Sequence, residues 1–176
     1  ASIFNPTELN TDQWLETAHK LGAKYAVLVA KHCSGFSLWP TEAHDYSIKQ
    51  SPWKNGEGDI VADFIASCKK YNIKPGIYAS TTANGYLYVD NPGVPVTQEE
   101  YNKIVTQQLT ELWSNYGELF EIWFDGGVLS KDQGGADVLS LVQKLQPNAI
   151  AFQGPYGHPN LIRWVGNEEG VAPYPC

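Results

Sequence analysis

The sequence predicts an α/β protein in which helices cover a parallel sheet, as part of a (β/α)8 TIM-type barrel. Helical and strand patterns alternate along the 176 residues, which is typical of βαβ units. The polar and glycine-rich segments follow the strands rather than precede them, as they do in barrels. About four or five strands can be recognised, so we expect residues 1–176 to form a single, incomplete barrel domain. A flavodoxin-like open sheet is the structural alternative.

The expected strands are short apolar runs, and the first of them, 24–30, is apolar enough to predict burial on both faces. The expected helices show apolar residues on one face, beginning with Trp14, Leu15, Ala18 and Leu21 in the first helix. Asp59 is expected to cap the second helix, and Thr97 with Glu100 forms the capping box of the third. The strands are expected at 24–30, 73–79, 119–125, 149–152 and 161–165, and the helices at 11–21, 60–71, 98–116 and 136–146.

Composition and charge limit the classes of partner. The net charge of −7, with no Lys/Arg cluster, argues against nucleic acid and against an anionic membrane surface. No run of about 18 apolar residues predicts a membrane span. Aromatic residues make up 12% of the chain, which fits either a large aromatic core or a surface that stacks on sugar rings, and composition alone favours the core. The sequence predicts no metal and no cofactor.

The chain has three cysteines, Cys33, Cys68 and Cys176, which allow one disulfide. The sequence does not fix which two of them would pair. Because none of them forms a CxxC pair, a zinc site is not expected. The chain starts without Met and without a signal peptide, so we expect a processed chain or a piece of a longer one. The open edges of a partial sheet need covering, either in a homo-oligomer or by the remainder of a longer chain.

The run Phe120–Gly127 is the most informative segment, because a strand of large apolar residues ends in Asp125 and two glycines. Other polar residues also lie at strand ends: His32 and Cys33, Tyr78, and Glu168 and Glu169. Two carboxylates from different strand ends with aromatics between them suit glycoside hydrolysis, in which one attacks and the other carries a proton. The alternatives are structural: a hydrogen-bonding Asp125, a structural His32, a solvated Glu168–Glu169 pair, and tryptophans 39, 113 and 164 that serve packing.

The ordered motifs of the chain resemble those of the family 29 glycoside hydrolases, the retaining α-L-fucosidases. The resemblance rests on Lys31–Trp39, Asp45-Tyr46, Asp59–Val61, Gly76–Ser80, Glu121–Gly127 and Arg163–Glu168. Asn84–Val89 and the Glu-Ile-Trp-Phe-Asp-Gly-Gly run are similar to the branch that acts on α-1,3- and α-1,4-linked fucose.

The resemblance implies hydrolysis of terminal α-L-fucosidic bonds through a covalent fucosyl-enzyme. It gives Asp125 the role of nucleophile and Glu168 that of acid/base, with Glu169 as the second candidate. It places His32, Trp123, Tyr78, Cys33 and Trp39 around the sugar; Cys33 stands where the family loop has a second histidine. The expected partner is a fucosylated oligosaccharide or glycoconjugate, and the expected location is secreted or extracellular. The alternative is a sugar-binding protein or barrel fragment without activity.

Overall fold

The structure is a computed structural model that describes residues 1–89, 96–172 and 174. Helices and strands alternate, as the sequence predicts. The strands are β1 (Tyr25–Lys31), β2 (Lys74–Ala79), β3 (Glu121–Trp123), β4 (Ile150–Phe152) and β5 (Leu161–Ile162). The helices are α1 (Thr11–Lys20), α2 (Ile60–Lys70), α3 (Gln98–Ser114) and α4 (Val138–Leu145), with short 3-10 turns η1 (Ile48–Gln50), η2 (Trp53–Gly56), η3 (Gly85–Leu87) and η4 (Lys131–Gln133).

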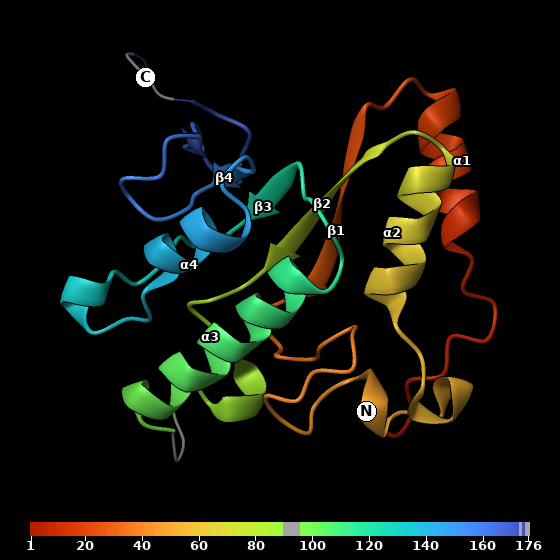
Figure 1. Cartoon of the computed structure of the whole chain (residues 1–176), viewed down its shortest axis with the longest axis horizontal. Helices are drawn as coiled ribbons and strands as arrows, with labels where there is room; N and C mark the ends of the chain where they lie inside the picture. Colours follow the sequence, from red (N-terminus) through yellow and green to blue (C-terminus); the bar gives the residue numbers. More distant parts are fainter. Residues whose placement is uncertain (90–95, 173, 175–176) are drawn as a thin grey trace.

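The five strands lie side by side in the order β1-β2-β3-β4-β5, and each neighbouring pair is parallel (Figure 1). Sequential parallel neighbours are what consecutive strands of a (β/α) barrel form, whereas a flavodoxin-like sheet has the order 2-1-3-4-5. The predicted α/β fold with an incomplete barrel is therefore confirmed, and the open-sheet alternative is wrong.

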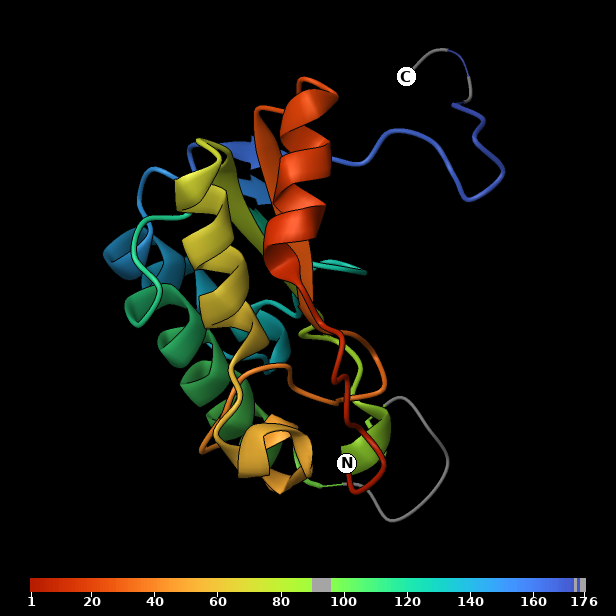
Figure 2. The ribbon, with the colours of Figure 1, turned by 90° about the vertical axis from the view of Figure 1, so that its right-hand side faces the viewer.

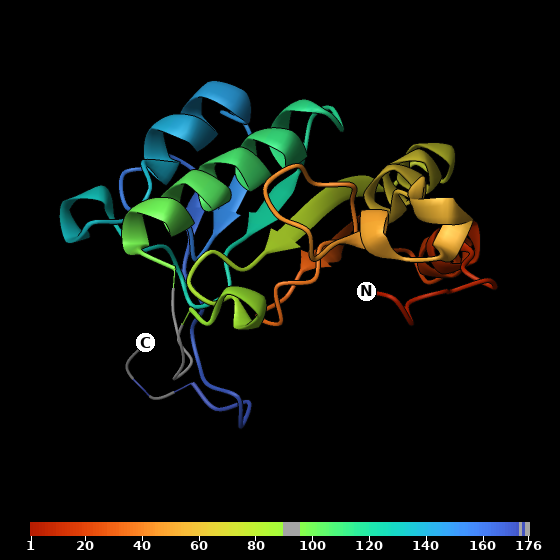
Figure 3. The ribbon, with the colours of Figure 1, turned by 90° about the horizontal axis from the view of Figure 1, so that it is seen from below.

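The helices cover one face of the curved sheet (Figure 3). Ile77 of β2, Ile122 of β3 and Ala151 of β4 share this face and are at most 2% exposed. They pack with Val105 and Leu109 of α3 in the largest core cluster. The capping box of Thr97 with Glu100 and the cap of Asp59 on α2 are both present, so these two local predictions are confirmed.

The opposite face carries a row of paired residues that runs across the sheet: Val29, Tyr78, Trp123 and Phe152. Val29 is 44% and Trp123 37% exposed. The prediction that the first strand is buried on both faces is therefore wrong, because in the described part of the chain helices pack only on the other face. In a closed barrel this face is the interior.

Three further expectations differ from the structure. The third strand ends at Trp123 and the fifth at Ile162, earlier than predicted; β5 pairs with β4 through only two residues, so the ladder stops there. In α1, Leu15 is buried, but Trp14 is 44% and Leu21 83% exposed. The buried stripe of α1 is thus narrower than its apolar residues suggest. Trp164, predicted to pack, is 46% exposed.

Lys31, the last residue of β1, is buried on the helix-covered face. It pairs with Ala79 in the sheet register, is 2% exposed, and lines a small cavity with Trp39, Val105 and Leu109. Burial lowers the pKa of its amine from 10.5 to about 8, because a charged amine loses its hydration there. The buried charge must therefore cost stability at neutral pH.

We expect Lys31→Met to raise the free energy of unfolding by about 3 kcal/mol at pH 7, the equivalent of the pKa shift. The folded pKa lies below the unfolded one, so the cost is fully present below about pH 8. It fades as pH rises from there toward 10.5, because the folded-state amine is then neutral and the free energy needed to remove its proton falls with pH. Urea unfolding of both proteins at pH 7 and pH 10 measures the difference.

The matched control is Lys24→Met, since Lys24 is exposed just before the same strand. Its effect should be within about 0.5 kcal/mol at both pH values. An equal stability of wild type and Lys31→Met at pH 7, or a gain that grows with pH, would contradict the buried-charge account.

Candidate active site

Asp125 lies just past the end of β3, where side chains from two other strand ends converge on its carboxylate. The Tyr78 hydroxyl at the end of β2 donates a hydrogen bond to Asp125 Oδ2. The Cys33 thiol, after β1, lies 3.9 Å from the same oxygen, and His32 Nε2 lies 4.0 Å from it. The structure thus brings together four of the predicted site residues.

The register of the sheet explains this convergence. Tyr78 and Trp123 are paired between β2 and β3, and Asp125 follows Trp123 by two residues, so all three face the side of the sheet away from the helices. An irregularity in the pairing between Val29 and Lys31 precedes His32. The His32 ring then stacks on Tyr78, with ring centroids 5.8 Å apart and planes 4° from parallel.

Trp123 completes an aromatic wall beside the carboxylate. Its ring lies 6.0 Å from Tyr78 and 4.6 Å from Phe152, measured between ring centroids. The indole remains 37% exposed, so one part of it is free to contact a ligand. A flat, half-exposed aromatic beside a carboxylate can pack against the C–H face of a sugar ring while the carboxylate reaches its polar atoms.

The loop after β2 fixes the backbone that follows Asp125. Thr82 Oγ1 donates to the Asp125 carbonyl at 3.3 Å, and Thr81 Oγ1 to that of Gly127 at 3.1 Å. Gly126 has a φ of 69°, and a Cβ there would lie 3.1 Å from Thr82 Oγ1, so glycine suits this close approach. The sequence did not single out either threonine, because nothing in their local pattern shows that they meet the next loop.

The Tyr78 hydroxyl keeps its proton at neutral pH and well above it, so it is a neutral hydrogen-bond donor. Burial, and after it the hydrogen bond to Asp125, raise the pKa of this phenol well above its usual value. A protonated phenol donates to an ionised carboxylate and orients it. The Asp125 side chain keeps 43% of its surface exposed, so the oriented carboxylate stays accessible to a ligand.

The other predicted site residues are not brought to this carboxylate. Glu168 and Glu169 are exposed in a segment that follows β5 and leaves the body of the molecule (Figure 2). There Asn167 Oδ1 accepts the amides of Glu169 and Val171. Trp39 is 1% exposed and donates its indole N–H to Glu111 of α3 at 2.8 Å. The contact of Trp39 with the sugar stays a prediction, and the burial of Trp39 does not support it.

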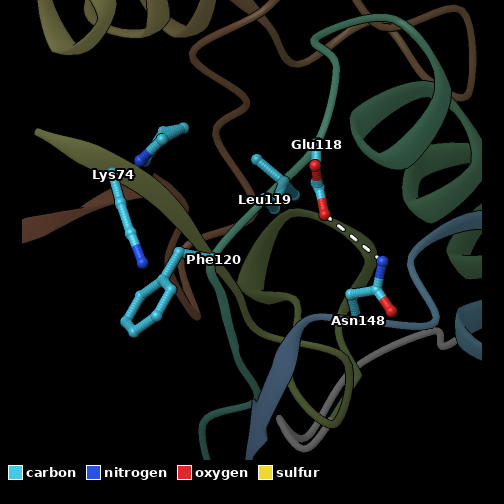
Figure 4. A pocket seen from close by; sticks show the side chains of 6 residues that line it. Lys74, Glu118, Leu119, Phe120 and Asn148 are labelled. Atoms are coloured by element: carbon cyan, nitrogen blue, oxygen red, sulfur yellow. Dashed lines mark hydrogen bonds between the residues drawn. The ribbon is translucent and has the colours of Figure 1, made fainter. Parts of the chain in front are cut away.

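Two of the hollows in the described part of the chain differ in their relation to Asp125. One, of about 420 Å³, lies at the amino ends of β2, β3 and β4, where Asn148 donates to Glu118 at 3.4 Å (Figure 4). It is at the opposite end of the strands from Asp125, so it has no part in this site. The other, of about 810 Å³, begins at Gly126 and Gly127 and extends between the loops after β3 and β4. Its lining therefore starts at the residue after Asp125.

The cysteines of the described residues, Cys33 and Cys68, are both free thiols, and Cys176 lies outside the described residues. Cys33 Sγ also lies 3.8 Å from Ser80 Oγ. Metal-ligating atoms of His32, Cys33 and Asp125 all lie within 4.8 Å of one another.

None of the helices in the described ranges has the length and apolar character needed to cross a bilayer.

An accessible, oriented carboxylate beside an aromatic wall is what a nucleophile toward a sugar requires. The sequence comparisons agree with this geometry, since the family model described as Alpha-L-fucosidase matches residues 1–157. The chain belongs to the α-L-fucosidase family. It is 40% identical over 185 residues to Alpha-L-fucosidase 1 of Arabidopsis thaliana, covering 99% of the chain and 34% of that relative. A rice relative, Putative alpha-L-fucosidase 1 of Oryza sativa subsp. japonica, is 35% identical over 184 residues, which is 99% of the chain and 33% of the relative.

Solved structures of this family share the fold. A candidate α-L-fucosidase from Bacteroides thetaiotaomicron superposes with a TM-score of 0.87 at 41% identity, covering 99% of the chain and 42% of that protein. A glycoside hydrolase 29 family member from an unknown rumen bacterium gives a TM-score of 0.75 at 33% identity, covering 95% and 32%. The chain spans about a third of the length of the curated relatives named above.

Proposed function

We propose that the protein containing this chain hydrolyses terminal α-L-fucosidic bonds by a retaining mechanism, with Asp125 as the nucleophile. The observation that carries this proposal is the Asp125 carboxylate itself. It is held by the Tyr78 hydroxyl, lies beside the half-exposed Trp123, and remains 43% exposed. Membership of the α-L-fucosidase family supports the choice of fucose as the sugar.

In the first step, Asp125 attacks the anomeric carbon while an acid protonates the departing glycosidic oxygen, which leaves a β-linked fucosyl-enzyme. In the second step, the residue that acted as the acid removes a proton from water. The water attacks the anomeric carbon, breaks its bond to Asp125 and releases α-L-fucose. We assign the acid/base role to Glu168, with Glu169 as the second candidate. His32 and Trp123 contact the sugar, and the Tyr78 hydroxyl orients the carboxylate of the nucleophile.

The substrates we propose are fucosylated oligosaccharides and glycoconjugates, with fucose in α-1,3 or α-1,4 linkage, and the location we propose is secreted or extracellular. The hollow of about 810 Å³ next to Gly126 and Gly127 would hold the rest of the glycan. Its lining includes Tyr156, over whose ring the Arg163 guanidinium lies at 3.8 Å. A flat surface with a hydrogen-bonding cation suits a sugar that carries the fucose.

The test is the stereochemistry of hydrolysis, followed by proton NMR on an aryl α-L-fucoside with the complete protein. We expect α-L-fucose to appear first and the β-anomer only later, by mutarotation. A first product of β configuration would make the enzyme inverting. Fucose-dependent thermal stabilisation without any hydrolysis would favour the alternative of a sugar-binding protein without turnover.

A further inference from the structure

The side chains of His32, Cys33 and Asp125 combine three types of metal ligand at one point of the structure. An imidazole nitrogen, a thiol sulfur and a carboxylate oxygen all lie within 4.8 Å of one another. His32 and Cys33 are adjacent in sequence, whereas Asp125 comes from β3's end, two strands away. No CxxC or HxxxH spacing reveals such a cluster, so it is visible only in the folded chain.

The spacing of these atoms is close to that of a tetrahedral zinc site. Typical bond lengths of about 2.3 Å to sulfur and about 2.1 Å to nitrogen or oxygen place tetrahedral ligands about 3.4–3.6 Å apart. The carboxylate oxygen is 3.9 Å from the Cys33 sulfur and 4.0 Å from His32 Nε2. Small side-chain rotations would therefore bring the three atoms into coordination.

We propose that His32, Cys33 and Asp125 form a binding site for a thiophilic divalent cation such as Zn²⁺, and that an ion bound there blocks the active site. The blocking effect, but not the binding, rests on the proposed role of Asp125 as nucleophile. Three protein ligands leave a fourth position for water. The Cys33 thiol releases its proton to the solvent on binding, since the thiolate is the ligand.

The surroundings of the cluster favour such an ion. The His32 and Asp125 side chains are 63% and 43% exposed, so a hydrated cation can reach them. The Tyr78 hydroxyl donates to Asp125, and a hydrogen bond of this kind orients a ligating carboxylate. The amine of Lys31 is buried on the helix-covered face of the sheet, close enough to Cys33 for its charge to attract a thiolate there. Cys33 decides the preference, because a thiolate selects Zn²⁺ over Mg²⁺ or Ca²⁺.

Binding is tested by titrating the complete protein, stripped with a chelator, with Co²⁺ as a spectroscopic probe. We expect one Co²⁺ per chain at this site, with a thiolate-to-cobalt charge-transfer band in the near ultraviolet and the visible bands of tetrahedral cobalt. Zn²⁺ should abolish both, and Mg²⁺ should not. Cys33→Ser should lose the charge-transfer band, and His32→Gln should weaken Co²⁺ binding at least about tenfold.

Two matched variants separate this cluster from other thiols and histidines. Cys68→Ala removes the other described thiol, which lies on the buried face of α2, and His19→Gln removes an exposed histidine of α1. Both should keep the full cobalt spectrum. A spectrum that survives in Cys33→Ser, or no band in the wild type, overturns the proposal.

Inhibition separates this proposal from the proposed function. Zn²⁺ should inhibit aryl-fucosidase activity competitively with substrate, and fucose should lower the apparent affinity for Co²⁺. A cobalt spectrum in a protein whose Asp125→Ala variant still hydrolyses the fucoside would keep the metal site and reject Asp125 as nucleophile. An active enzyme that depends on Asp125 but gives no cobalt spectrum would reject the metal site and keep Asp125 as the nucleophile.

Discussion

Replacing Asp125 by alanine is expected to lower kcat/KM for an aryl α-L-fucoside by at least about 10³-fold, because the variant lacks the carboxylate that we propose forms the covalent intermediate. The carboxylate lies just past the end of β3 and is held by the Tyr78 hydroxyl. Its backbone is fixed separately, by the hydroxyl of Thr82. The change therefore removes the attacking group without removing its support, and the folded state should survive. Initial rates and thermal unfolding of both proteins measure these two effects.

Azide makes the Asp125 test sharper than loss of activity alone. In Asp125→Ala the space of the carboxylate is open, so azide can attack the anomeric carbon directly and give β-L-fucosyl azide, with inverted configuration. The matched control is Asp63→Ala in α2, an aspartate of the helical layer that pairs with Lys54; its activity should stay within about twofold. Retained activity in Asp125→Ala, or an azide product of α configuration, would reject the nucleophile assignment.

The fold was predictable because its signals are local. Each strand is a short apolar run, and the capping box of Thr97 with Glu100 marks the start of α3. The burial of β1 was not predictable in the same way. Whether Val29 is covered depends on what packs on the second face of the sheet, and apolar residues of a barrel interior look the same in sequence as those under a helix.

The site was predictable in part for a similar reason. Asp125 and His32 each follow a strand and Tyr78 lies near the end of one, and parallel strands bring their carboxyl ends to one edge. The contacts of Thr81 and Thr82 with the loop after β3 depend on how two loops meet, and the buried position of Trp39 depends on Glu111, 72 residues away. No local pattern contains such information. The place of Glu168 relative to Asp125 was expected only through the family resemblance.

Glu168→Ala is expected to lower kcat/KM for a fucosylated oligosaccharide by about 10²–10⁴-fold, the usual contribution of a general acid. A sugar alkoxide is a poor leaving group and needs the proton, whereas an aryl group with a low phenol pKa leaves without it. The loss of kcat/KM should therefore be much smaller for such an aryl fucoside. Comparing the two substrates in the same variant identifies the acid.

Glu169→Ala is the matched control, because both glutamates are exposed in the same segment and differ by one position. The amide of Glu169 is bound by Asn167 Oδ1, so the turn itself does not depend on either carboxylate. We expect Glu169→Ala to change kcat/KM by less than about threefold.

With an activated aryl fucoside, azide should accelerate Glu168→Ala and yield α-L-fucosyl azide, since azide attacks the fucosyl-enzyme without a general base. The opposite pattern would move the role to Glu169. Azide insensitivity of both variants would place the acid/base outside this pair and leave Asp125 as the one chemical group of the reaction in the described chain.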